Sequence, residues 1–146
     1  MPAASETGAL RTLFMRRVDA WLAADLDAYI DCWADDMTIE LPTGRVVGKE
    51  RYRDLVRAGF GWAAPLAFDV HHLAFEEGTE IALADWTIRA RRRDDGVVVG
   101  WRGLSVCEFR AEKITWWREH HLIPPGPIDE TQAKQTEGGG VAGVDP

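Results

Sequence analysis

The spacing of apolar residues changes once along this chain, from a helical period to a period of two, and this limits the folds open to it. Three stretches with apolar residues every three to four positions come first, at residues 6–23, 25–33 and 48–60. Four alternating segments follow, at residues 66–75, 81–92, 97–109 and 114–123, separated by connectors short enough for hairpins. The pattern predicts an α+β domain in which three helices lie on one face of an antiparallel sheet.

Length and charge narrow the classes of function. The chain has 146 residues, enough to bury a core without disulfides or metal, and a net charge of −7, which argues against nucleic acid or an anionic membrane as the main partner. No apolar run approaches the roughly 20 residues that span a bilayer, and the first residues lack the layout of a signal peptide. We therefore expect a cytoplasmic protein.

Cysteine and histidine usage gives no sign of a metal or a cofactor. Cys32 and Cys107 lack metal-ligand or redox spacing, so we interpret them as two reduced core thiols. Strand alternation sends His71 and His72 to opposite faces, where they could not bind one ion together. His72 shares its face with Phe68 and is expected to be a core histidine. We predict neither a metal nor a cofactor.

Both faces of the segment at residues 81–92 are apolar, which predicts that each is covered. Helices would cover one face and a second copy of the chain the other, giving a homodimer. The alternative is a monomer whose outer face is shielded by long Arg and Trp side chains. The prolines from Pro124 onward should end strand pairing by about Ile123. We therefore predict a domain at residues 1–125 and a mobile acidic tail at residues 126–146, of which residues 131–146 should not affect activity.

One arginine in the first helix and a group of polar residues in the last strand occupy positions where the pattern calls for apolar residues. Arg17 lies in the middle of the apolar stripe of the first helix, so it must snorkel, pair with a buried carboxylate or face a polar cavity. In the last strand, alternation puts Trp117, Glu119 and His121 on one face, where carboxylate and imidazole stand side by side as acid–base chemistry requires. The alternative is that the run Arg118–His121 is a solvated edge.

Three stretches resemble the nuclear transport factor 2-like superfamily, and in particular its SnoaL-like members: residues 33–44, 65–70 and 113–119. The superfamily includes ketosteroid isomerase, limonene epoxide hydrolase and the SnoaL-like polyketide cyclases. The resemblance covers roughly residues 8–125 and implies a curved sheet wrapped around a conical pocket that the helices close. It also argues against isomerisation by the ketosteroid isomerase mechanism, since Leu41, Arg17 and Ser105 stand where that family has its base, its tyrosine and its acid.

The resemblance also assigns residues to the pocket. Glu119 matches the essential aspartate of the hydrolases and cyclases, and Asp85 matches one carboxylate of the hydrolase. We expect a catalytic group of four residues, namely Glu119, His121, Asp85 and Arg17. The expected substrate-binding residues are Trp21, Phe60, Trp86, Trp101, Trp117, Leu41 and His72.

Seven tryptophans favour a flat, apolar ligand of polycyclic, aromatic or terpenoid type. The leading hypothesis is a cofactor-independent acid–base enzyme that cyclises, isomerises or dehydrates a polyketide-like molecule. Two alternatives stay open. One is an epoxide hydrolase or epoxide-opening cyclase that uses Asp85 and Glu119 together. The other is a non-catalytic module for ligand binding or dimerisation.

Overall fold

A computed structural model describes residues 4–128 of the chain and confirms the α+β class. Three helices occur in this range: α1 (Ala4–Leu22), α2 (Leu26–Asp31) and α3 (Lys49–Trp62). The six strands are β1 (Trp33–Leu41), β2 (Gly44–Val47), β3 (Ala63–Phe75), β4 (Ile81–Arg92), β5 (Val98–Arg110) and β6 (Lys113–Pro127). The four strands expected from the sequence did not include β1 and β2, which form a short antiparallel hairpin between α2 and α3.

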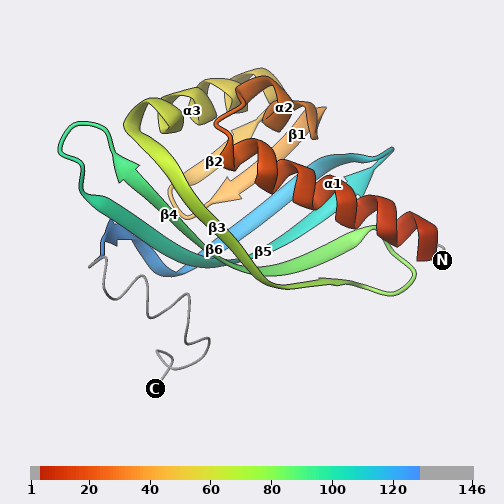
Figure 1. The fold of residues 1–146 in the computed structure, drawn as a ribbon. Coiled ribbons are helices and arrows are strands. Elements are labelled where there is room, and N and C mark those ends of the chain that lie inside the picture. Colours follow the sequence, from red (N-terminus) through yellow and green to blue (C-terminus); the bar gives the residue numbers. More distant parts are fainter. Residues whose placement is uncertain (1–3, 129–146) are drawn as a thin grey trace.

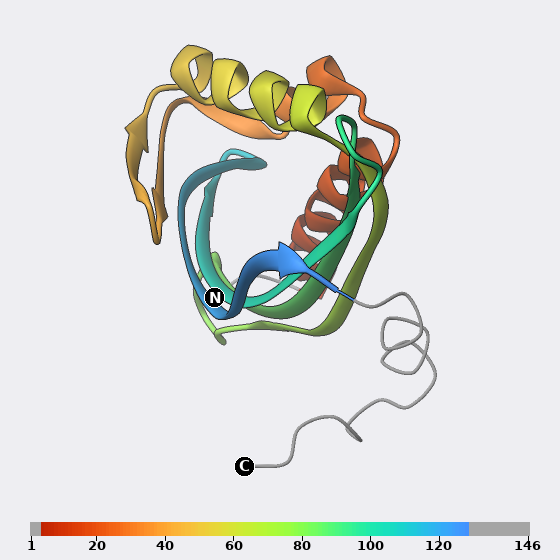
Figure 2. The same cartoon turned by 90° about the vertical axis from the view of Figure 1, so that its left-hand side faces the viewer.

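The strands form one sheet in the order β2-β1-β6-β5-β4-β3. All neighbouring strands are antiparallel except β1 and β6, which pair in parallel. Helix α3 and the strands β2 to β5 lie between these two strands in the sequence. Figure 2 shows the sheet curling around α1, with α3 across the opening of the curve. In Figure 1 both helices lie on the same side of the long strands. The concave face therefore encloses the core, and none of the three helices within residues 4–128 covers the convex face.

Local signals set the ends of the helices. Asp25 begins α2 because its side chain accepts a hydrogen bond of 3.1 Å from the backbone N–H of Ala28. Gly48 precedes α3 with a φ of +95°, a conformation that side chains disfavour. On the core side of α1, Leu13, Phe14 and Val18 are buried against the sheet.

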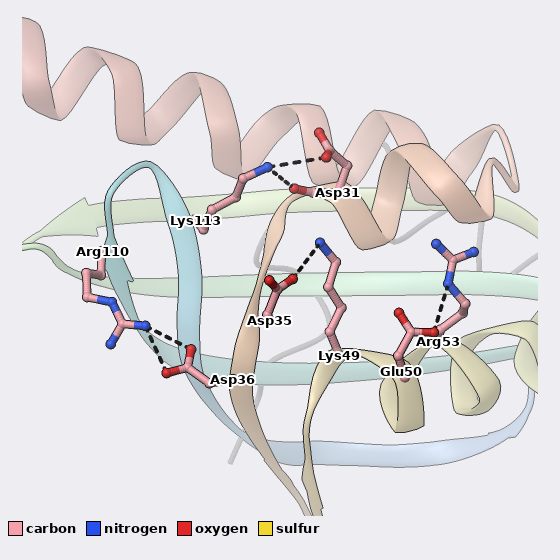
Figure 3. A network of polar contacts seen from close by, with 8 residues as sticks. All are labelled: Asp31, Asp35, Asp36, Lys49, Glu50, Arg53, Arg110 and Lys113. Carbon is pink, nitrogen blue, oxygen red and sulfur yellow. Dashed lines mark hydrogen bonds and ion pairs between the residues drawn. The ribbon is translucent and has the colours of Figure 1, made fainter.

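Exposed ion pairs connect α2, β1, α3 and the β5–β6 turn at one end of the sheet (Figure 3). Arg110 is 2.8 Å from Asp36, Lys113 is 3.3 Å from Asp31, and Lys49 is 3.7 Å from Asp35. Exposed pairs of this kind contribute little to stability. They lie at the end of the sheet where β1 pairs with β6.

The end of β6 corrects one prediction. Pairing does not stop at Ile123, since Gly126 and Pro127 pair with Gly100 and Val99 of β5. Proline is tolerated there because β1 pairs with β6 only between Ile114 and Arg118, so the other edge of β6 needs no N–H donors beyond that point. The tail predicted to be mobile lies, from residue 129 onward, outside the described residues.

A bulge in β3 corrects a second prediction. Val70 pairs with Trp86 and His72 with Asp85, so His71 is an extra residue. The bulge puts both histidines on the convex face, where His71 bonds Thr87 at 2.7 Å and His72 is 81% exposed. His72 is therefore not a core histidine, and strand alternation gave the wrong face for it.

The two cysteines are free and buried, which confirms the interpretation as reduced core thiols. Burial raises the pKa of Cys107 from 9.0 to about 12. Among the described residues, no helix has the length and apolarity that crossing a membrane requires.

Candidate functional site

Two adjacent cavities of about 180 Å³ each lie between the helices and the concave face of the sheet. They share one wall, formed by Trp21, Tyr29, Tyr52, Val56 and Trp101. The inner cavity also contacts Arg17, Leu41, Phe68, Trp86, Trp117 and Glu119. The outer cavity extends past Phe60 toward the end of α3. Six of the seven residues expected to bind substrate line these cavities, and His72 does not.

Glu119 and His121 form a bonded pair on the concave face of β6. His121 Nε2 and Glu119 Oε2 are 2.7 Å apart, and the side chains are only 15% and 14% exposed. Trp117 Nε1 donates to the other oxygen, Glu119 Oε1, at 3.0 Å. Alternation along one strand thus places donor, carboxylate and imidazole on the same face, as the sequence predicts. The solvated-edge alternative is wrong for this face.

Trp86 supports the pair from the neighbouring strands. Its indole meets the ring of His121 edge-on, with centroids 6.1 Å apart, and its Nε1 donates to Ser105 at 2.8 Å. The indole reaches this place because Gly103 lies beneath it, where a Cβ atom would be 2.6 Å from the ring. Gly103 is therefore a position where only hydrogen leaves room for the wall of the site.

Arg17 is 3% exposed and faces the inner cavity from α1. Its guanidinium carbon lies 4.4, 4.7 and 5.2 Å from the ring centroids of Trp117, Phe14 and Phe68. These cation–π contacts offset part of the cost of burying the charge. Within residues 4–128, Arg17 Nε and Nη2 are buried without a hydrogen-bond partner. Of the three options set out for Arg17, the structure is nearest to the third, but the cavity that Arg17 faces is lined mainly by aromatic and aliphatic side chains instead of polar ones.

A tyrosine pair in the shared wall was missed by sequence reasoning. The hydroxyls of Tyr29 in α2 and Tyr52 in α3 are 2.8 Å apart and buried. Burial, together with the nearby Tyr29 and the charge of Glu119, raises the pKa of Tyr52 well above 10.0, although Arg17 lowers it. Tyr52 thus stays neutral and offers a hydroxyl to the cavities. Its only sequence signal was a tyrosine on an apolar helix stripe.

Asp85 is not part of this site, which corrects the predicted catalytic group. Trp86 is buried on the concave face, so alternation turns Asp85 to the convex face, where it bonds His72 at 3.0 Å and lies 3.5 Å from Arg102. Burial raises its pKa, but the bonds from His72 and Arg102 outweigh that effect and hold the pKa below 3.8. Asp85 and Glu119 are on opposite faces, so the two-carboxylate route to epoxide opening lacks one of its groups.

Among residues 4–128, the site therefore holds one carboxylate with an imidazole, one arginine without a polar partner at two of its nitrogens, and a hydrogen-bonded tyrosine pair, with aromatic walls. This arrangement can move a proton to or from an apolar ligand and stabilise negative charge on it. Among residues 4–128, no group of His, Cys, Asp or Glu side chains is placed to hold a metal ion.

Comparison with known proteins gives a consistent result. Residues 14–117 match the SnoaL-like domain family. No curated protein is significantly similar to the chain. Each of the three solved structures described next is under 25% identical and shows the fold alone.

An NTF-2 like protein of unknown function from Burkholderia xenovorans is 20% identical, with 88% of this chain and 93% of that chain covered and a TM-score of 0.64. An LEH-like epoxide hydrolase from M. tuberculosis is 22% identical, with 79% of this chain and 83% of that chain covered and a TM-score of 0.67. A candidate polyketide cyclase from Pseudomonas putida is 16% identical, with 74% of this chain and 87% of that chain covered and a TM-score of 0.66. All three share the fold of this chain.

Proposed function

Since the chain belongs to the SnoaL-like domain family, we propose that it is a cofactor-independent acid–base enzyme acting on a hydrophobic, polycyclic small molecule of polyketide type. The observation that carries this proposal is the bond of 2.7 Å between Glu119, which lines the aromatic inner cavity, and His121; both side chains are largely buried. A structural acid on a solvated edge would need neither the imidazole nor the burial. A purely binding module would need no acid there at all.

In the proposed reaction, Glu119 takes a proton from a carbon next to a carbonyl of the substrate. The C–H bond breaks, an O–H bond forms on Glu119, and the electron pair becomes an enolate. Glu119 then returns the proton to another atom of the substrate, which completes an isomerisation or prepares a cyclisation or dehydration. His121 and the Trp117 indole fix the carboxylate, so its remaining lone pairs face the cavity in one orientation.

Deuterium exchange tests the role of Glu119 without knowledge of the natural substrate. A panel of bicyclic and tricyclic ketones in D₂O reports, by NMR, proton removal next to the carbonyl. We expect the protein to catalyse exchange of at least one of them, and Glu119→Gln to lower the rate by about 10²- to 10⁴-fold, as for other general bases. Glu77→Gln, at an exposed glutamate in the β3–β4 turn, is the control.

Two results would contradict the proposal. One is the absence of enzyme-dependent exchange across the panel. The other is a Glu119→Gln rate within about threefold of wild type, a loss too small for a general base.

We also propose that the chain forms a homodimer through the convex face of the sheet. Leu83 and Leu104 on the convex face are 49% and 45% exposed, and no helix covers them among the described residues. A second copy would remove this apolar surface from water. The pocket opens on the other side of the sheet, so a dimer of this kind leaves it accessible.

A further inference from the structure

The buried arginine in the inner cavity carries information about the ligand that the acid–base pair does not. Arg17 lines the inner cavity, and its Nε and Nη2 are buried N–H donors with no acceptor among residues 4–128. We propose that the pocket selects ligands bearing an anionic oxygen group, such as a carboxylate or an ionised enol or phenol, on a flat apolar skeleton, and that this group binds Arg17. The inference rests on the proposed function in one respect only, that ligand and acid–base pair share the cavity.

Among residues 4–128, the surroundings of Arg17 supply no hydrogen-bond acceptor for Nε or Nη2. The three rings around it attract the cation through their faces but are poor hydrogen-bond acceptors. A buried charged donor without a partner is costly, and the guanidinium is a planar fork that fits two oxygens at once. A carboxylate or a pair of enol oxygens matches that fork.

The negative charge already in the cavity does not neutralise Arg17. Glu119 is the only carboxylate among the residues lining the inner cavity, and its oxygens bond Trp117 and His121. The described residues show no ion pair between Glu119 and Arg17. Tyr52 lies close enough to both that their charges affect its pKa in opposite directions. An anionic group could therefore sit on Arg17 while the carbon skeleton reaches Glu119.

The aromatic walls of the cavities indicate which shape of carbon skeleton such a ligand has. The outer cavity adjoins the inner cavity at the shared wall that holds Trp21 and Trp101, and the ring centroids of Phe60 and Trp21 are 6.5 Å apart. Aromatic walls of this kind favour a flat body. The acidic head thus binds at the inner end, and the apolar body points outward along the indoles.

A matched pair of probes tests the charge preference directly. 2-Naphthoate and 2-naphthamide have the same skeleton and differ in the negative charge. Isothermal titration at neutral pH should give a dissociation constant about tenfold or more lower for naphthoate than for the amide, as for a charge-assisted bond. Arg17→Met should remove the preference. Arg16→Met, at the exposed neighbouring arginine, should keep it.

Several outcomes would overturn the inference. Equal affinity of the two probes for wild type, absence of naphthoate binding up to about 1 mM, or an unchanged preference in Arg17→Met would show that Arg17 is structural or satisfied by water alone. If Arg17→Met does not fold, Arg17→Lys decides, because an ammonium lacks the fork and should lower the ratio. An unchanged ratio in Arg17→Lys overturns the inference.

Binding by Glu119→Gln separates this inference from the proposed function. That variant should bind naphthoate at least as tightly as wild type, because it removes a like charge from the cavity. A failed exchange assay with intact naphthoate preference would overturn the acid–base role alone. Normal exchange without the preference would overturn the role of Arg17 alone.

Discussion

Arg17 and Glu119 carry the two charges of the inner cavity, and different contacts hold each in place. Glu119 is fixed by hydrogen bonds from its own strand, through Trp117 and His121. Arg17 is held mainly by aromatic faces and keeps free donors. Under the proposed function, these contacts orient the carboxylate for proton transfer and leave the guanidinium able to bind a ligand.

Cys107 should make stability depend on alkaline pH. Burial raises its pKa in the folded state from 9.0 to about 12, so the folded protein keeps a proton that the unfolded chain loses. The stabilisation is complete below pH 9 and is lost as the pH rises toward 12. We expect the free energy of unfolding to fall by up to about 1.4 kcal/mol per pH unit in that window.

Urea unfolding of wild type and Cys107→Ala at about pH 8, 9 and 10 measures this effect. The raised pKa of Tyr52 acts in the same direction at higher pH, so the difference between the two proteins isolates the thiol. The variant should be less stable at the lowest pH, because it leaves a small cavity, and should lose stability more slowly as the pH rises. Parallel pH dependence in the two proteins would contradict the argument.

The positions of single site residues were predictable where they depend on the spacing within one helix or one strand. The period of β6 was enough to put Glu119 beside His121, and the stripe of α1 was enough to single out Arg17. The Tyr29–Tyr52 pair was not predictable, because it joins two helices whose relative position depends on the packed sheet. No spacing along the chain encodes that contact.

At the level of strands, bulges decide which side chains reach the site. The helix-to-strand order and the four-strand meander follow from the apolar period, and the structure confirms them. Alternation then holds only until a strand gains a residue, as β3 does at His71. That bulge moves His72 out of the core and onto Asp85. The position of a bulge depends on cross-strand packing, so the single-strand pattern could not reveal it.

Asp85 failed as a site residue for a different reason. Its own strand alternates regularly, with Ala84 and Trp86 buried on either side of it, so the pattern already puts it opposite Trp86. The prediction that Asp85 is catalytic came instead from its match to a carboxylate of the hydrolase. Residue parity was the better guide at this position.

The convex face of the whole molecule is the surface on which the proposed dimer depends. Light scattering should give twice the chain mass of 16.3 kDa for wild type. Leu104→Glu replaces an exposed leucine of the convex face with a charge and should shift the mass to that of a monomer, since a stable interface buries about 800 Å² on each partner. Met15→Glu, on the exposed side of α1, is the control. A monomeric wild type, or an unaffected Leu104→Glu dimer, would contradict the proposed interface.

The central claim is that proton transfer depends on one carboxylate in the concave pocket, and comparison of Glu119→Gln with Asp85→Asn in the exchange assay tests it most directly. Both variants replace a carboxylate with an amide of the same shape, on opposite faces of the same sheet. The account predicts a loss of about 10²-fold or more for Glu119→Gln and a rate within about threefold of wild type for Asp85→Asn. Equal losses in the two variants, or a larger loss in Asp85→Asn, would contradict it.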